Sequence, residues 1–84
     1  MVVHRRYTDF EKLDDWLRRR HEAFPTSQIG SLPFLPEKKI LGKFKASFVE
    51  QRRSALEEYL TYIVKNQEIS SYPYVRDWFV NAEY

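Results

Sequence analysis

Only one segment of this chain has the composition of a β-strand, and it lies at the very start of the sequence. Val2–Tyr7 combines β-branched and aromatic residues and contains neither glycine nor proline. A single strand cannot satisfy its own backbone donors and acceptors, so it must pair with other strands. The sequence therefore predicts that Val2–Tyr7 belongs to a sheet whose other strands lie upstream of it or, as the less favoured explanation, in another molecule.

The remaining sequence predicts helices that are separated by a proline-rich loop. Thr8 with Glu11, and Ser47 with Glu50, have the spacing of capping boxes, in which side chains satisfy free amides at a helix start. The chain is therefore expected to form a strand over 1–7, a helix over 8–24, a proline-rich and membrane-facing loop over 25–46, and helices over 47–66 and 71–81.

The size and composition of the chain restrict it to one small folded domain. Its 84 residues lie close to the lower limit for a chain that buries its own core. The contents of 31% charged and 17% aromatic residues are typical of a folded domain and not of a disordered tail. With no cysteine, and with His4 and His21 outside any metal-ligand spacing, we expect no disulfide, metal or other cofactor. No apolar run approaches the ~20 residues of a membrane span.

Cationic and apolar residues alternate in the stretch that follows the prolines. From Glu37 to Arg53, six Lys/Arg stand against two Glu, a local charge of +4, whereas the whole chain carries +2. The apolar side chains between these charges are Ile40, Leu41, Phe44 and Phe48. This mixture is typical of a loop that approaches an anionic lipid surface and inserts side chains into it.

Arg52 occupies an unusual position in the helix predicted after this loop. The apolar residues of that helix recur with the helical period of 3.6 and are Val49, Leu56, Tyr59, Leu60 and Ile63. At about 100° per residue, Arg52 falls on this stripe between Leu56 and Tyr59. A guanidinium on a core-facing stripe needs either a carboxylate partner or an anion from outside. The helical pattern alone leaves both explanations open.

Three motifs stand out in this chain: the run RRYTDF, the proline-rich segment Leu32–Pro36 and the stretch Phe48–Leu60. Together they resemble the motifs of the phox homology (PX) domain, a phosphoinositide-binding module. The run RRYTDF over Arg5–Phe10 resembles its R-[RK]-Y-x-[DE]-F motif, and Leu32–Pro36 resembles its proline-rich segment. Phe48–Leu60 resembles its F-[IVL]-E-x-R-R-x-x-L-E-x-[YF]-L helix. The resemblance implies an α+β fold, in which a three-stranded antiparallel sheet packs on a helical subdomain. The chain is then expected to be an N-terminally truncated domain that keeps only the third strand as a remnant of the sheet.

The resemblance also implies a lipid headgroup site of four residues. Arg6 resembles the arginine that binds the 3-phosphate, for which a planar guanidinium is well suited. Tyr7 resembles the aromatic residue under the inositol ring, and Lys38 the lysine that contacts the 1-phosphate. Arg52 resembles the arginine that hydrogen-bonds the 4- and 5-hydroxyls, which would explain its place on the apolar stripe.

The function that the resemblance implies is recruitment of a parent protein to a membrane. Its expected lipid is phosphatidylinositol 3-phosphate on endosomal or vacuolar membranes, which a cytoplasmic trafficking or sorting protein would bind from the periphery. The expected membrane-insertion residues are Ile40, Leu41 and Phe44, and the auxiliary basic residues are Lys39, Lys43 and Lys45.

Three other classes of function have weaker support in the sequence. A protein-interaction domain with little or no lipid binding is the main alternative, either through Pro33–Pro36, which has the spacing of an SH3 ligand, or through the unpaired edge of Val2–Tyr7. Nucleic-acid binding is disfavoured because the net charge is only +2 and residues 66–84 carry −2. An enzyme is not expected, since no carboxylates have a recognisable catalytic spacing and two glycines cannot form a glycine-rich phosphate loop.

Overall fold

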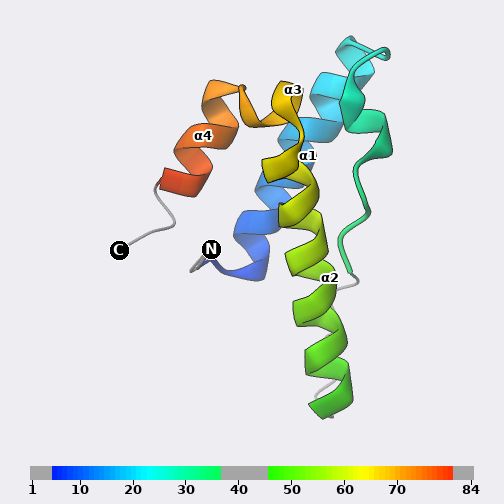
Figure 1. Ribbon diagram of the computed structural model, residues 1–84, viewed down its shortest axis with the longest axis vertical. Coiled ribbons are helices and arrows are strands. Elements are labelled where there is room, and N and C mark those ends of the chain that lie inside the picture. Colours follow the sequence, from blue (N-terminus) through cyan, green and yellow to red (C-terminus); the bar gives the residue numbers. More distant parts are fainter. Residues whose placement is uncertain (1–4, 37–45, 81–84) are drawn as a thin grey trace.

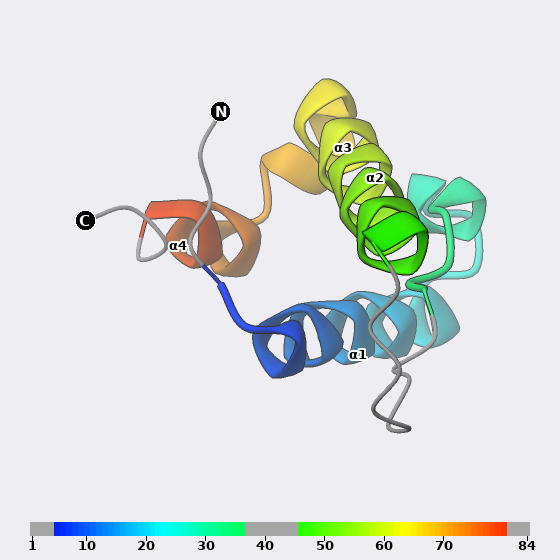
Figure 2. The ribbon, with the colours of Figure 1, turned by 90° about the horizontal axis from the view of Figure 1, so that it is seen from below.

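The computed structural model describes residues 5–36 and 46–80, and all regular elements within these two ranges are helical (Figure 1). In chain order they are α1 (Tyr7–Ala23), the short 3-10 helix η1 (Gln28–Ser31), α2 (Ala46–Lys65), α3 (Gln67–Ser70) and α4 (Pro73–Val80). Figure 2 looks along α2 and shows α1, α4 and the α2–α3 pair on three sides of the molecule.

The expected α+β fold with a sheet remnant is wrong, because none of the described residues forms a strand. Arg6 has an extended backbone, with φ −78° and ψ 158°, but Tyr7 is already the first residue of α1. The backbone N–H of Arg6 donates to the Asp9 carboxylate at 3.1 Å, and its carbonyl accepts from Asp9 N at 2.9 Å. These groups therefore begin a helix instead of pairing with a strand. The described part of Val2–Tyr7, from Arg5 onward, accordingly offers no strand edge to a partner.

The beginning of α1 also differs from the expected capping box. Arg6 is the N-cap residue, and the carboxylate of Asp9 satisfies its amide, whereas Thr8 is an exposed residue inside the helix. The helix ends at Ala23, one residue earlier than expected. A proline disfavours the helical conformation of the residue before it, and Phe24 next to Pro25 has φ −132° and ψ 77°.

The C-terminal half contains two helices where the sequence predicted only one after α2. The second long helix begins at Ala46, so Ser47 lies within the helix and not before its first residue. It ends at Lys65, and the side chain of Asn66 then accepts a hydrogen bond from Ile69 N at 3.0 Å. This cap starts the single turn of α3, which the sequence did not predict. The last helix begins at Pro73, where the missing N–H of proline costs nothing.

A single apolar core lies between α1, η1, α2, α3 and α4. The buried core residues come from all five elements and the adjoining Leu32, and they are Phe10, Leu13, Leu17, Ile29, Leu32, Tyr59, Leu60, Ile63, Ile69, Val75 and Trp78. Trp16 and Phe79 are partly buried at its edge. Val49 is 50% exposed, since the first turns of α2 project beyond the other described elements (Figure 1). The apolar stripe of α2 is therefore core only in its later turns.

Candidate functional site

Two of the four predicted headgroup residues lie in direct contact. The guanidinium carbon of Arg52 is 4.3 Å from the centroid of the Tyr7 ring, in a cation–π arrangement. Tyr7 is the first residue of α1 and Arg52 lies in the N-terminal half of α2, and both side chains are half-buried. The fold therefore brings together an aromatic face and a cation from the two motifs.

The two neighbouring arginines of α2 have different environments. Arg53 is exposed and hydrogen-bonds Glu50 at 3.2 Å and Glu57 at 2.8 Å. This pairing lowers the pKa of Glu50 and raises the pKa of Arg53. Among the described residues, no carboxylate forms an ion pair with Arg52. The helical pattern left open whether Arg52 has a carboxylate partner or binds an anion from outside. The described part of the chain does not supply the carboxylate partner.

Tyr7 also contacts the end of the proline-rich segment. Its hydroxyl donates a hydrogen bond to the carbonyl of Pro36, the last described residue before α2 is reached. Lys38 follows Pro36 by two residues but lies outside the described residues. The same is true of the other predicted loop residues, which are Lys39, Ile40, Leu41, Lys43, Phe44 and Lys45.

Arg6 directly precedes Tyr7, and its side chain is exposed to solvent. The N-cap position places it at the positive end of the α1 dipole, which favours anions near the first turn. Asp9, whose carboxylate accepts from the backbone N–H of Arg6, offsets part of this charge. Arg6 is thus adjacent to Tyr7 in the sequence, but no described contact joins Arg6 to the Tyr7–Arg52 pair.

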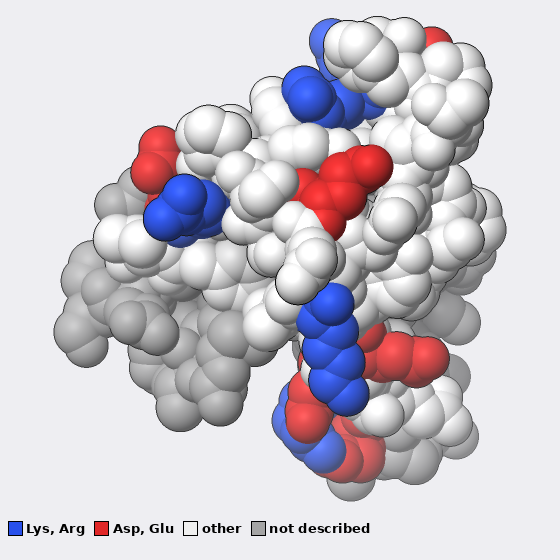
Figure 3. All heavy atoms as spheres, turned by 45° about the horizontal axis from the view of Figure 1, so that its top comes forward, with Lys and Arg blue, Asp and Glu red and all other residues white. Residues whose placement is uncertain are grey.

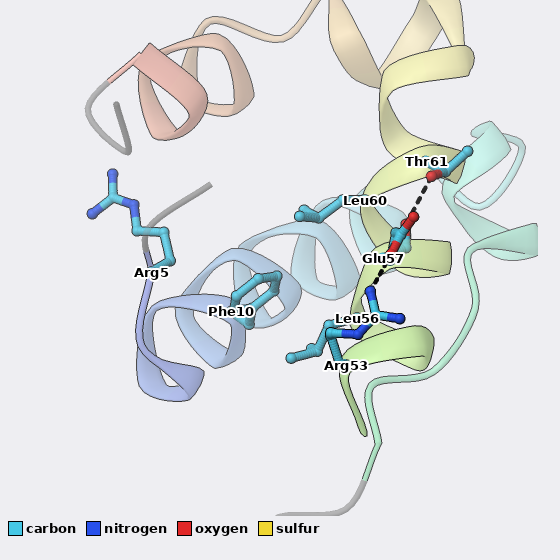
Figure 4. Close-up of a pocket in the computed structure, with 7 residues that line it drawn as sticks. All are labelled: Arg5, Phe10, Arg53, Leu56, Glu57, Leu60 and Thr61. Atoms are coloured by element: carbon cyan, nitrogen blue, oxygen red, sulfur yellow. Dashed lines mark hydrogen bonds and ion pairs between the residues drawn. The ribbon is translucent and has the colours of Figure 1, made fainter. Parts of the chain in front are cut away.

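A separate pocket of about 410 Å³ lies between α1 and α2, and sequence reasoning did not identify it (Figure 4). It is lined by Arg5, Phe10, Arg53, Leu56, Glu57, Leu60 and Thr61. Leu56 and Leu60 belong to the predicted apolar stripe of α2, and this stripe is the signal in the sequence that could have indicated the pocket. Of its two cations, Arg53 is paired with Glu57, and the guanidinium of Arg5 contacts Trp78 through a hydrogen bond and a cation–π interaction.

The face of the molecule drawn in Figure 3 does not present a broad cationic surface. In Figure 3, the cationic and acidic side chains are interspersed among uncharged residues. The local charge of +4 found between Glu37 and Arg53 therefore depends largely on lysines outside the described ranges. Among the described helices, none is both long and apolar enough to cross a membrane. The described His, Asp and Glu side chains likewise form no group that could hold a metal ion.

Comparison with known proteins tests the family resemblance that the sequence motifs indicated. The family model of the PX domain matches residues 1–82. The chain belongs to the PX domain family. It is 30% identical to sorting nexin-15 of Homo sapiens over 99% of its length. It is 38% identical to the vacuolar protein sorting-associated protein vps5 of Schizosaccharomyces pombe over 92% of its length. It is 35% identical to the serine/threonine-protein kinase Sgk3 of Rattus norvegicus over 88% of its length.

The chain spans only a small part of each of these relatives. The chain covers 24% of the length of sorting nexin-15, 11% of that of vps5 and 14% of that of Sgk3. The match to the kinase Sgk3 therefore concerns the PX domain of Sgk3 alone. No solved structure gives a significant match. The family confirms the resemblance seen in the RRYTDF run and the α2 motif, and together with the sorting relatives it supports a phosphoinositide-binding module of membrane trafficking.

Proposed function

We propose that this PX domain binds the headgroup of phosphatidylinositol 3-phosphate and recruits its parent protein to endosomal or vacuolar membranes for trafficking or sorting. The contact between Arg52 and the ring of Tyr7 is the observation that carries the proposal. Arg6 would bind the 3-phosphate, Tyr7 would support the inositol ring, and Arg52 would donate to the 4- and 5-hydroxyls. Lys38 would contact the 1-phosphate from the loop that follows Pro36.

The Tyr7–Arg52 pair supports the proposal because it orients a cation before a ligand arrives. A planar guanidinium that already rests on an aromatic face loses little conformational freedom when it forms hydrogen bonds. Each charge-assisted hydrogen bond to a headgroup contributes about 1.5–3 kcal/mol. Three basic residues therefore give selectivity for a phosphorylated inositol but only moderate affinity.

The loop between Pro36 and α2 would supply the remaining membrane affinity. In this proposal Ile40, Leu41 and Phe44 insert into the interface. Lys39, Lys43 and Lys45 would be attracted to anionic lipid, at about 1 kcal/mol per cation near the surface. Headgroup recognition, insertion and nonspecific attraction are each too weak for stable anchoring, but together they suffice. The protein would thus associate with the membrane peripherally.

The proposal is tested by binding to liposomes that contain phosphatidylinositol 3-phosphate or unphosphorylated phosphatidylinositol. The wild-type chain should prefer the phosphorylated lipid, and Arg6→Gln should lose this preference while its helical circular dichroism is unchanged. Arg19→Gln is the control, because Arg19 is an exposed arginine of the same helix that pairs with Asp15. If Arg6→Gln kept the selectivity of the wild type, the assignment of Arg6 would be wrong.

A protein-interaction function is the second candidate, and the exposure of Phe34 favours it. This side chain lies inside the Pro33–Pro36 segment and is 84% exposed. The carbonyls of Pro33 and Pro36, however, already accept hydrogen bonds from Arg18 and Tyr7. Titration of the chain with SH3 domains, followed through the ring resonances of Phe34, tests this candidate. If saturating concentrations of an SH3 domain left these resonances unchanged, binding to that SH3 domain would be excluded.

A further inference from the structure

Arg18 connects α1 to the beginning of the proline-rich segment. Its Nη2 donates hydrogen bonds to the carbonyls of Leu32, at 3.3 Å, and Pro33, at 2.9 Å. Its guanidinium carbon also lies 4.9 Å from the centroid of the Phe34 ring. One side chain thus contacts three successive residues of the segment. Nothing in the headgroup motifs assigns a role to Arg18.

Asp14 and Tyr59 hold Arg18 in this position. The Nε of Arg18 donates to Asp14 Oδ1 at 3.2 Å, and the hydroxyl of Tyr59 donates to the same oxygen at 2.9 Å. Tyr59 belongs to α2 and is fully buried, and this burial and the nearby Asp14 carboxylate raise the pKa of its hydroxyl. The hydroxyl therefore stays protonated and remains a donor under ordinary conditions. Through Asp14, Arg18 is fixed to the core face of α2.

The other end of the segment is held by the proposed headgroup site. Leu32 is buried with 3% exposure, and Pro36 accepts a hydrogen bond from the Tyr7 hydroxyl. Proline rings fix φ near −65° at both Pro33 and Pro36, so the short stretch between the two attachment points has little freedom. A displacement at Pro33 is therefore transmitted to Pro36.

We propose that Arg18 is a positioning residue for the headgroup site. By holding the carbonyls of Leu32 and Pro33, it sets the position at which Pro36 meets the Tyr7 hydroxyl. It acts through the proline-rich segment and does not itself contact the headgroup. The inference rests on the proposed function of Tyr7 and Arg52 in headgroup binding.

The chain offers a matched control for a test of this role. Arg19 is the next residue of α1 and forms the same i,i+4 pair, with its Nε 3.0 Å from Asp15 Oδ2. Both side chains of that pair are highly exposed, at 77% and 62%, and neither contacts the proline-rich segment in the described structure. Arg18→Gln and Arg19→Gln therefore remove the same charge from the same helix, and only the first removes the contacts to Leu32 and Pro33.

The experiment measures calorimetric affinity for a soluble short-chain phosphatidylinositol 3-phosphate, at a temperature where thermal scans show every variant folded. Arg18→Gln should bind about tenfold more weakly than the wild type, which corresponds to about 1.4 kcal/mol. Arg19→Gln should stay within about twofold of the wild type, because exposed pairs contribute little. Arg18→Lys keeps the charge beside Asp14 but loses the planar guanidinium with its paired donors. This variant replaces Arg18→Gln in the affinity measurement if the glutamine variant does not fold. It should show an intermediate loss.

A double-mutant cycle separates positioning from a general effect on the fold. Tyr7→Phe removes the hydrogen bond to Pro36 and keeps the ring under Arg52. If Arg18 acts through Pro36, Arg18→Gln should cost less than about twofold in the Tyr7→Phe background, because the connection is already broken. Additive losses would overturn the inference. Wild-type affinity in both Arg18 variants would also overturn it while leaving the proposed function intact. Absence of binding by the wild type would instead overturn the proposed function, and this inference with it.

Discussion

Arg5 and Trp78 connect the two ends of the described chain. The Nη2 of Arg5 donates to the carbonyl of Trp78 at 2.9 Å, and its guanidinium carbon lies 5.2 Å from the centroid of the indole ring. Trp78 in turn donates from Nε1 to the carbonyl of Asp9 at 3.1 Å and packs edge-on against Phe10 at 5.2 Å. These contacts attach α4 to the first turn of α1. That turn carries Tyr7, so the proposed site depends on a contact formed far from it in sequence.

Removal of the Arg5 contact should destabilise the fold. Arg5→Met keeps an apolar stem over the indole but loses the hydrogen bond and the cation–π interaction. We expect the free energy of unfolding to fall by about 1 kcal/mol. A larger loss is not expected, since the buried Nε of Arg5 has no partner among the described residues and already carries a cost. Urea denaturation measures the change, with Arg76→Met at an exposed site of α4 as the control. Equal losses in the two variants would contradict the prediction.

Tyr59 should make the stability of the domain depend on alkaline pH. Burial, and then the negative charge of Asp14, raise the pKa of its hydroxyl in the folded state. An unfolded tyrosine ionises near pH 10. A group whose pKa is higher in the folded state contributes its full stabilisation below the unfolded pKa, and loses it as the pH rises above that value. The free energy of unfolding should therefore fall more steeply from about pH 9 to about pH 11 in the wild type than in Tyr59→Phe.

The same substitution has a second expected effect at neutral pH. Tyr59→Phe removes a donor from the Asp14 carboxylate and should cost about 1–2 kcal/mol of stability at pH 7. Urea denaturation of both proteins across the pH range measures both effects, and other titrating groups cancel in the difference. Parallel pH profiles for the wild type and Tyr59→Phe would mean that the buried hydroxyl is not linked to folding.

The headgroup motifs assigned Tyr7 and Arg52 to one site but did not predict that the two side chains are in contact. Helical periodicity placed Arg52 on the apolar stripe and required a partner for it, and the RRYTDF run singled out Tyr7. Nothing in the two patterns says that these side chains touch, because that depends on how α1 crosses α2. The Asp14–Tyr59 hydrogen bond was missed for the same reason. The four-residue spacing of Asp14 and Arg18 was visible in the sequence, but it indicates a surface pair as readily as an anchor.

The strand prediction failed for a local reason. The composition of Val2–Tyr7 favours an extended chain, and the backbone of Arg6 is indeed extended. Composition does not show whether extended residues have a strand to pair with. At Arg6 the Asp9 carboxylate supplies the partner, so the chain turns into a helix at Tyr7.

Arg52 and Arg53 provide a direct comparison of two adjacent cations. Arg52→Gln should weaken binding to soluble headgroup by about tenfold or more, because it removes a charge-assisted donor of about 1.5–3 kcal/mol. Arg53→Gln should change it by less than about twofold, since Arg53 is already paired with Glu50 and Glu57 and exposed pairs contribute little. Calorimetric titration of the two variants measures the contrast. A larger effect of Arg53→Gln would place the ligand in the pocket between α1 and α2 instead.

The loop prediction separates membrane insertion from headgroup recognition. Ile40→Glu or Leu41→Glu should weaken binding to liposomes that contain phosphatidylinositol 3-phosphate, while binding to the soluble short-chain lipid stays within about twofold. An apolar side chain contributes up to about 1.5–3 kcal/mol when fully inserted and less at the interface. A carboxylate in its place enters the interface at a cost and is repelled by anionic lipid.

Val64→Glu is the matched control for these loop variants, because it makes the same change at an apolar residue of α2 that is 48% exposed. Val64 lies close to the C-terminal end of α2, whereas the loop enters that helix at its first residue. The control should leave liposome binding unchanged, since the added charge stays in solvent away from the proposed interface. Liposome sedimentation and calorimetry with the soluble lipid give the two affinities. If Ile40→Glu weakened both to the same extent, the loop would shape the headgroup site and would not be an insertion device.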